Sequence, residues 1–165
     1  MERLLKRVHA SAALTQALRW LSHITTAFAV GLLVLLLYDS WRLSELSAMK
    51  LALILALPFL AVSLVRKLVH APRPYELYDF YGSEIRHKEG ESFPSRHAHS
   101  AFAIGVAALP RLPVLGAVLL ALGALMCVAR VLLGIHFIRD VAAGALCGAL
   151  TSVIGLLIAQ PFPFI

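Results

Sequence analysis

Long apolar windows without a formal charge recur along the chain. The window between Arg19 and Asp39 holds 19 uncharged residues, and the window between Arg111 and Arg130 holds 18. After Asp140 the remaining 25 residues carry no charged side chain. A helix needs about 20 mostly apolar residues to cross the hydrocarbon core of a bilayer. These windows therefore predict membrane-spanning helices.

Two further windows are shorter: 15 residues between Lys50 and Arg66, and 14 between Arg96 and Arg111. Such helices can still span if the flanking cations reach the interface or if their ends are buried among other helices. The fold class predicted is all-α, a polytopic membrane helix bundle forming one domain over residues 1–165. Five transmembrane helices are expected, at 20–38, 48–68, 95–112, 113–133 and 140–160.

The segments outside these spans have their own patterns. In residues 1–19, apolar side chains recur at helical spacing with Arg3, Lys6 and Arg7 between them. This predicts an amphipathic helix on the membrane surface, with a frayed polar tail as the alternative. The apolar run behind it is longer than a signal-peptide core, so we expect an uncleaved first span. The polar stretch 71–95 is expected to be a loop.

Composition supports this picture and narrows the partners. The 165 residues are 60% hydrophobic and 15% charged, with a mean hydropathy of +0.83. The net charge of +6 could indicate a nucleic-acid partner, but no stripe of basic and aromatic residues is present for stacking bases. An anionic lipid or another phosphate in the bilayer fits the charge better.

The first of three polar clusters lies at the end of an expected span. It contains Arg66, Lys67 and Arg73, with Pro72 and Pro74 stopping the helix. Cations seven positions apart at a helix end can converge on one anion. The alternative is that they are ordinary interfacial anchors.

The second cluster runs from Ser92 to His97 and leads directly into an apolar helix. Ser95 stands where an N-cap would, so free backbone N–H groups would face a phosphate, and Arg96 follows it. His97 in the first turn could donate a proton. The alternative is a capped helix with an interfacial histidine. A metal site on His97 and His99 is not favoured, because no carboxylate or cysteine lies nearby.

The third cluster contains Arg130, His136 and Asp140. His136 and Asp140 are four residues apart, so on a helix they would share a face and could hydrogen-bond. A carboxylate on one ring nitrogen leaves the other nitrogen free to act as a nucleophile. The alternatives are a surface His–Asp pair and a helix-start role for Asp140, which is compatible with the first reading.

In order, these clusters read Arg-x6-Arg-Pro, Pro-Ser-Arg-His and Arg-x5-His-x3-Asp, over roughly residues 50–160. This pattern resembles the type 2 phosphatidic acid phosphatase superfamily of lipid phosphate phosphatases. The resemblance implies that His136 attacks phosphorus with support from Asp140, and that His97 protonates the leaving oxygen and later activates water. It also implies a phosphate site without a metal or other cofactor. The expected phosphate-binding residues are Arg66, Lys67, Arg73, Ser95, Arg96 and Arg130.

The sequence departs from that family's pattern at three positions. Arg66 stands where the family usually has Lys, so Arg66 and the adjacent Lys67 remain alternatives for the same role, and the two side chains are not interchangeable. Arg96 replaces the usual Gly, and Ala129 replaces the usual Ser.

The function implied is hydrolysis of a lipid phosphate or pyrophosphate through a phosphohistidine intermediate. Candidate substrates are phosphatidylglycerol phosphate, phosphatidate, and polyprenyl phosphates or pyrophosphates. The alternatives are a lipid-linked phosphotransferase and a non-catalytic lipid-binding or transport protein.

We expect a plasma-membrane location with the active site on the cytoplasmic side. Five spans would put 12 of the 15 Lys and Arg residues on the side of the three motifs, leaving Arg42, Lys50 and Arg111 on the other.

Overall fold

The computed structural model describes residues 2–78 and 90–159, and every regular element in these ranges is a helix. The helices are α1 (Glu2–His9), α2 (Ala12–Leu43), α3 (Glu45–Val69), α4 (Pro74–Leu77), α5 (Arg96–Ala108), α6 (Pro113–Leu132) and α7 (Ile138–Ala159). Much of the predicted loop, residues 79–89, lies outside the described residues.

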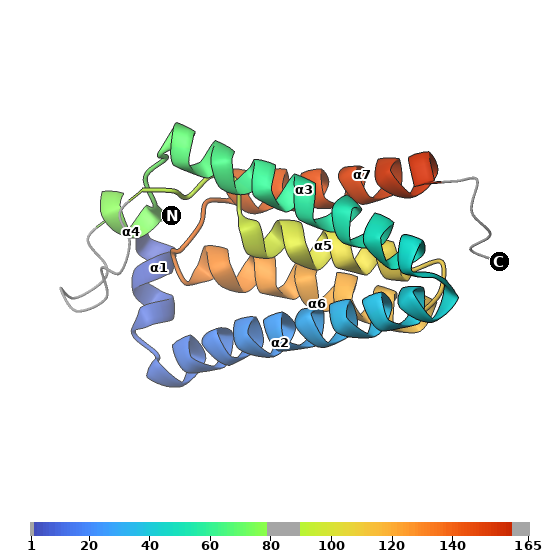
Figure 1. Cartoon of the computed structure of the whole chain (residues 1–165). Helices are drawn as coiled ribbons and strands as arrows, with labels where there is room; N and C mark the ends of the chain where they lie inside the picture. The colour runs from blue at the N-terminus through green and yellow to red at the C-terminus, as the bar shows by residue number, and fades with distance from the viewer. Residues whose placement is uncertain (1, 79–89, 160–165) are drawn as a thin grey trace.

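Five helices form an elongated bundle in which α5 lies among α2, α3, α6 and α7 (Figure 1). The four outer helices are long and apolar enough to cross a membrane, which confirms the predicted all-α membrane bundle. α5 has 13 residues and is about 20 Å long, less than the roughly 30 Å of the hydrocarbon core. Because the other four helices surround it, α5 does not have to match the bilayer on its own.

The predicted helix over residues 1–19 is wrong in its extent. α1 ends at His9, and Ser11 caps a new helix by accepting a hydrogen bond from the backbone N of Leu14 at 3.3 Å. Residues 12–19 therefore belong to α2. α1 buries Leu5 and Val8 and lies across one end of the bundle (Figure 1). The apolar face of α1 therefore packs against that end of the bundle.

The predicted first span, 20–38, is only the middle of α2, which has 32 residues. A charge-free window stops at Arg19 and Asp39, whereas the helix continues past both residues, from Ala12 to Leu43. At the far end of the bundle, Asp39 pairs with Arg111. Ser44 alone connects α2 to α3: it ends one helix and its hydroxyl accepts from the backbone N of Ser47 at 3.0 Å.

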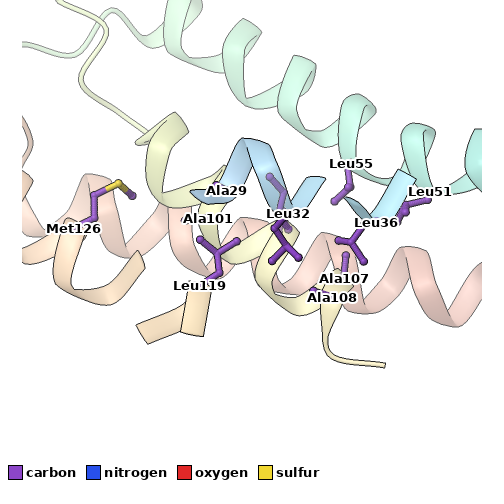
Figure 2. Packing of buried hydrophobic residues seen from close by; sticks show 12 residues of the cluster. Ala29, Leu32, Leu36, Leu51, Leu55, Ala101, Ala107, Ala108, Leu119 and Met126 are labelled. Atoms are coloured by element: carbon purple, nitrogen blue, oxygen red, sulfur yellow. The ribbon is translucent and has the colours of Figure 1, made fainter. Parts of the chain in front are cut away.

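The interior of the bundle is built from leucines and small residues. Leu32 and Leu36 of α2 and Leu51 and Leu55 of α3 face the alanines of α5 (Figure 2). The outer surface carries many exposed leucine, valine and isoleucine side chains. An apolar exterior of this kind is suited to lipid rather than to water.

Glycines bring α7 against α5. A Cβ on Gly144 would overlap the carbonyl oxygen of Ser95, and a Cβ on Gly148 would overlap that of His99. Small residues at such positions let helix backbones approach closely in a membrane. The position of α5 at the centre of the bundle therefore depends on these two glycines.

We expect Gly148→Ala to lower the unfolding temperature in detergent, since overpacking costs roughly 1–3 kcal/mol. Gly31 is the matched control because a Cβ there meets no atom within 4 Å. Gly31→Ala should leave the protein unchanged or stabilise it by up to about 1 kcal/mol. Equal unfolding temperatures for the two variants would contradict the packing described.

Candidate active site

The three motifs meet at one end of the bundle. α3 and α6 end there, α5 and α7 begin there, and α4 lies beside them (Figure 1). The antiparallel order of the helices thus brings together residues that are up to 74 positions apart in the sequence, from Arg66 to Asp140.

A tight turn after α6 places His136. Gly134 adopts a left-handed conformation with φ of 67°, which favours glycine. The carbonyl of Arg130 then accepts hydrogen bonds from the backbone N of Ile135 at 3.0 Å and of His136 at 3.3 Å. The imidazole of His136 points inward and is only 2% exposed.

Asp140 lies in the first turn of α7 and is fully buried. Its Oδ2 accepts a hydrogen bond from the backbone N of Phe137 at 2.9 Å, which stabilises the start of the helix. The predicted shared helix face is wrong, because His136 precedes α7. The turn nevertheless brings Nδ1 of His136 within 3.8 Å of Oδ2 of Asp140. Asp140 is both a helix-start residue and the partner of His136.

Ser92 is a member of this group that the sequence reasoning missed. Its hydroxyl donates to Oδ2 of Asp140 at 2.5 Å and lies 3.3 Å from Nδ1 of His136. Because the hydroxyl proton goes to Asp140, the oxygen can accept from Nδ1–H of His136. We infer this tautomer from the hydrogen bonds, and it leaves the lone pair on Nε2. Nothing in the sequence indicates a contact across 44 positions.

The basic residues of the first motif differ in burial. Arg66 is 4% exposed and its Nη1 donates to the carbonyl of Pro94 at 2.8 Å. Arg73 is also buried, and its Nε donates to the carbonyl of Gly90 at 3.0 Å. Lys67 is exposed on the outside of α3. The structure therefore brings Arg66 and Arg73, and not Lys67, into the buried site.

The start of α5 completes the arrangement. Ser95 is the N-cap, as predicted, and its backbone N donates to the carbonyl of Asp140 at 2.9 Å. Its buried hydroxyl makes no hydrogen bond within the described residues. Arg96 is partly buried and His97 is exposed in the first turn. A free hydroxyl and the helix N-terminus thus lie at the same place.

Arg139 is a second residue that the sequence reasoning did not single out. It is exposed, and its Nε lies 3.5 Å from Oδ1 of Asp140.

Within the described ranges, no group of three or more His, Cys, Asp or Glu side chains could hold a metal ion.

The electrostatic environment keeps His136 neutral. This residue lies between α6 and α7, outside the membrane-spanning helices. Burial lowers its pKa to about 4, with smaller contributions from the charges of Arg130 and Arg73, whereas the interaction with Asp140 acts in the opposite direction. A neutral imidazole with a free Nε2 can act as a nucleophile at pH 7.

Comparisons with known proteins agree with this fold. A crystal structure described as the first transmembrane PAP2-type phosphatidylglycerolphosphate phosphatase, from Bacillus subtilis, has a TM-score of 0.73 and 20% identity, covering 98% of this chain and 85% of the other. The crystal structure of Aquifex aeolicus LpxE has a TM-score of 0.69 and 21% identity, covering 94% of this chain and 93% of the other. The helices are therefore arranged as in these two proteins, the first of which is a transmembrane PAP2-type phosphatase.

The sequence itself matches the family model described as PAP2 superfamily over residues 47–163. The chain belongs to the PAP2 superfamily, which confirms the resemblance inferred from the three motifs. No curated protein sequence matches it significantly. Family and fold together support a membrane lipid phosphatase.

The burial of His136 predicts an unusual titration. In protein labelled at histidine, the ring resonances of His136 should titrate with a midpoint near pH 4, because protonation would place a charge in a buried site next to two arginines. The resonances are assigned by their loss in His136→Gln. A midpoint near 6.5, the value of an unperturbed histidine, would contradict the environment described.

Proposed function

We propose that this protein hydrolyses a lipid phosphate or pyrophosphate in the plasma membrane, through a phosphohistidine on His136. The observation that carries the proposal is the buried group of His136, Asp140 and Ser92 next to Arg66, Arg73 and Arg130. A neutral, oriented imidazole lies next to three arginines, which outnumber the two carboxylates that act on Arg66, those of Glu91 and Asp140. A phosphate would supply further negative charge there.

In the first step, Nε2 of His136 attacks phosphorus and an N–P bond forms as the bond to the leaving oxygen breaks. His97 donates a proton to that oxygen. The Nδ1–H of His136 stays directed at Ser92 and Asp140, so the positive charge that develops on the ring is stabilised by the carboxylate. The leaving lipid alcohol or lipid phosphate departs.

In the second step, His97 takes a proton from water, and the resulting hydroxide attacks the phosphohistidine. Inorganic phosphate leaves and His136 is restored. In both steps the transferring phosphoryl group carries charge on three oxygens, and fixed positive groups that face it lower the barrier. The groups offered are Arg66, Arg73, Arg130 and the hydroxyl of Ser95, with Arg96 beside them.

Because guanidinium groups and a helix N-terminus supply positive charge here, we propose that turnover needs no metal ion. We favour hydrolysis over transfer to a second substrate, because water alone suffices as the acceptor of the phosphoryl group.

The nucleophile is tested by substitution, with phosphate release from lipid phosphates measured in detergent and chelator. His136→Ala should lower kcat at least about 1000-fold. Asp140→Asn should lower it less, about 100-fold, because Asp140 orients the imidazole without reacting. Substantial turnover by a folded His136→Ala variant, or a strict requirement for Mg²⁺ in the wild type, would contradict the mechanism.

Arg66 and Lys67 form a matched pair for testing the phosphate site. Arg66→Ala should lower kcat/KM about 100-fold or more, because it removes a charged donor that faces the transition state. Lys67→Ala should lower it less than tenfold, as expected for an exposed surface charge. Two controls separate loss of the charge from loss of the hydrogen bond to Pro94. Arg66→Lys keeps the positive charge, and the unfolding temperature of each variant reports whether the protein is destabilised. A larger loss of kcat/KM in Lys67→Ala than in Arg66→Ala would mean that Lys67, one residue further on, fills the role assigned to Arg66.

The cytoplasmic orientation rests on the excess of Lys and Arg at the active-site end. Two exposed leucines at opposite ends test it: Leu77 of α4 (59% exposed) and Leu43 of α2 (52% exposed). Each is replaced by Cys in a background lacking Cys127 and Cys147. In intact cells, a membrane-impermeant thiol reagent should label Leu43→Cys and spare Leu77→Cys until lysis. The opposite labelling would put the site outside.

A further inference from the structure

A cavity of about 600 Å³ lies between α2, α3 and α5. Arg96 and His97 of the proposed site line one part of it, and apolar residues line most of the rest. Several of these apolar residues, including Ala29, Leu55 and Ala101, belong to the core shown in Figure 2. The cavity thus reaches Arg96 and His97 on one side and is lined mainly by apolar residues elsewhere.

His99 is the unexplained feature of this cavity. It lines the cavity and is 1% exposed, with its ring 6.4 Å from that of Phe59. Neither ring nitrogen has a hydrogen-bond partner within the described residues. Thr25 and Thr26, which also line the cavity, donate to carbonyls of their own helix at 2.8 Å. A buried polar group without a partner is costly, so its presence points to a partner that a ligand provides.

We propose that the cavity binds a hydrocarbon chain of the substrate lipid, and that His99 donates a hydrogen bond to a carboxylic ester carbonyl close to the phosphate. This proposal rests on the function proposed above. His97 and His99 both line this cavity, although two residues on an α-helix point about 200° apart around its axis. A lipid whose phosphate lies at His97 and whose chain fills the cavity therefore passes His99.

This geometry distinguishes two classes of candidate substrate. A diacylglycerol phosphate has ester carbonyl oxygens a few bonds from phosphorus. The chain of a polyprenyl phosphate is hydrocarbon from its first carbon and has no acceptor for His99. A polar site rejects a ligand that leaves its buried groups unpaired. The inferred substrate class is accordingly a glycerol-ester lipid phosphate.

The test compares diacyl phosphatidate with its dialkyl ether analogue, which lacks the carbonyl, in the wild type and in His99→Leu. The wild type should prefer the ester in kcat/KM by about tenfold, equivalent to about 1.4 kcal/mol. In His99→Leu that preference should fall to about onefold. An unchanged ester-to-ether ratio in a folded His99→Leu variant would overturn the role of His99.

A second pair of variants tests the cavity without disturbing the buried ring. Ala56 is exposed and lines the cavity, whereas Leu60, one turn further along α3, is exposed and does not line it. Ala56→Trp should raise KM about tenfold for long-chain phosphatidate relative to the dihexanoyl form, and Leu60→Trp should not. Equal effects of the two variants would overturn the chain-binding role.

These arms also separate this inference from the proposed function. A wild-type protein that releases phosphate from no lipid phosphate would overturn both. A wild-type protein that turns over phosphatidate and polyprenyl phosphate equally well, with no ester preference, would overturn the present inference and leave the proposed hydrolysis standing.

Discussion

The carboxylate of Asp140 is the group on which the rest of the site depends. Its Oδ2 accepts from the backbone N of Phe137 and from the hydroxyl of Ser92, and it faces the ring of His136. The backbone carbonyl of the same residue accepts from the backbone N of Ser95. One buried residue therefore sets the start of α7, holds the start of α5 next to it and orients the proposed nucleophile.

The arginines need a similar explanation, since charges are costly among apolar helices. The segment before α5 provides it. The carbonyl of Pro94 accepts a hydrogen bond from Arg66, and the carbonyl of Gly90 accepts one from Arg73. Each neutral carbonyl accepts one hydrogen bond from a guanidinium group and leaves its positive charge in place. The site therefore stays positive in the absence of ligand, and an anion with several oxygens can complete the remaining hydrogen bonds.

Much of this arrangement follows from sequence patterns, because bilayer thickness limits what an apolar window can be. Charge-free windows located the helices of the bundle, and the order of the three motifs identified the family. The windows missed the true length of α2 because a helix can continue past Arg19 and Asp39 into the interface. The break at Ser11 was missed because a single N-cap interrupts a continuous amphipathic pattern.

Within the site, the limits come from contacts across the bundle. Helical spacing paired His136 with Asp140 for the wrong reason, since a turn at Gly134, not a helix, brings them together. Ser92 was named only as the start of the second cluster, and its role could not be found because its two partners lie 44 and 48 positions away along the chain. Counting alone could not separate Arg66 from Lys67, whereas burial does: one faces the site and its neighbour faces outward.

The central claim is that a covalent bond forms between His136 and phosphorus, and trapping that bond tests it most directly. In His97→Ala, water activation should be slow, so an aryl phosphate labelled with ³²P, whose leaving group needs no proton, should leave label on the protein. The label should be stable to base and labile to acid, and it should map to the tryptic peptide Val131–Arg139, which contains His136. Label on any other peptide, or multiple turnovers without a labelled protein, would contradict the account.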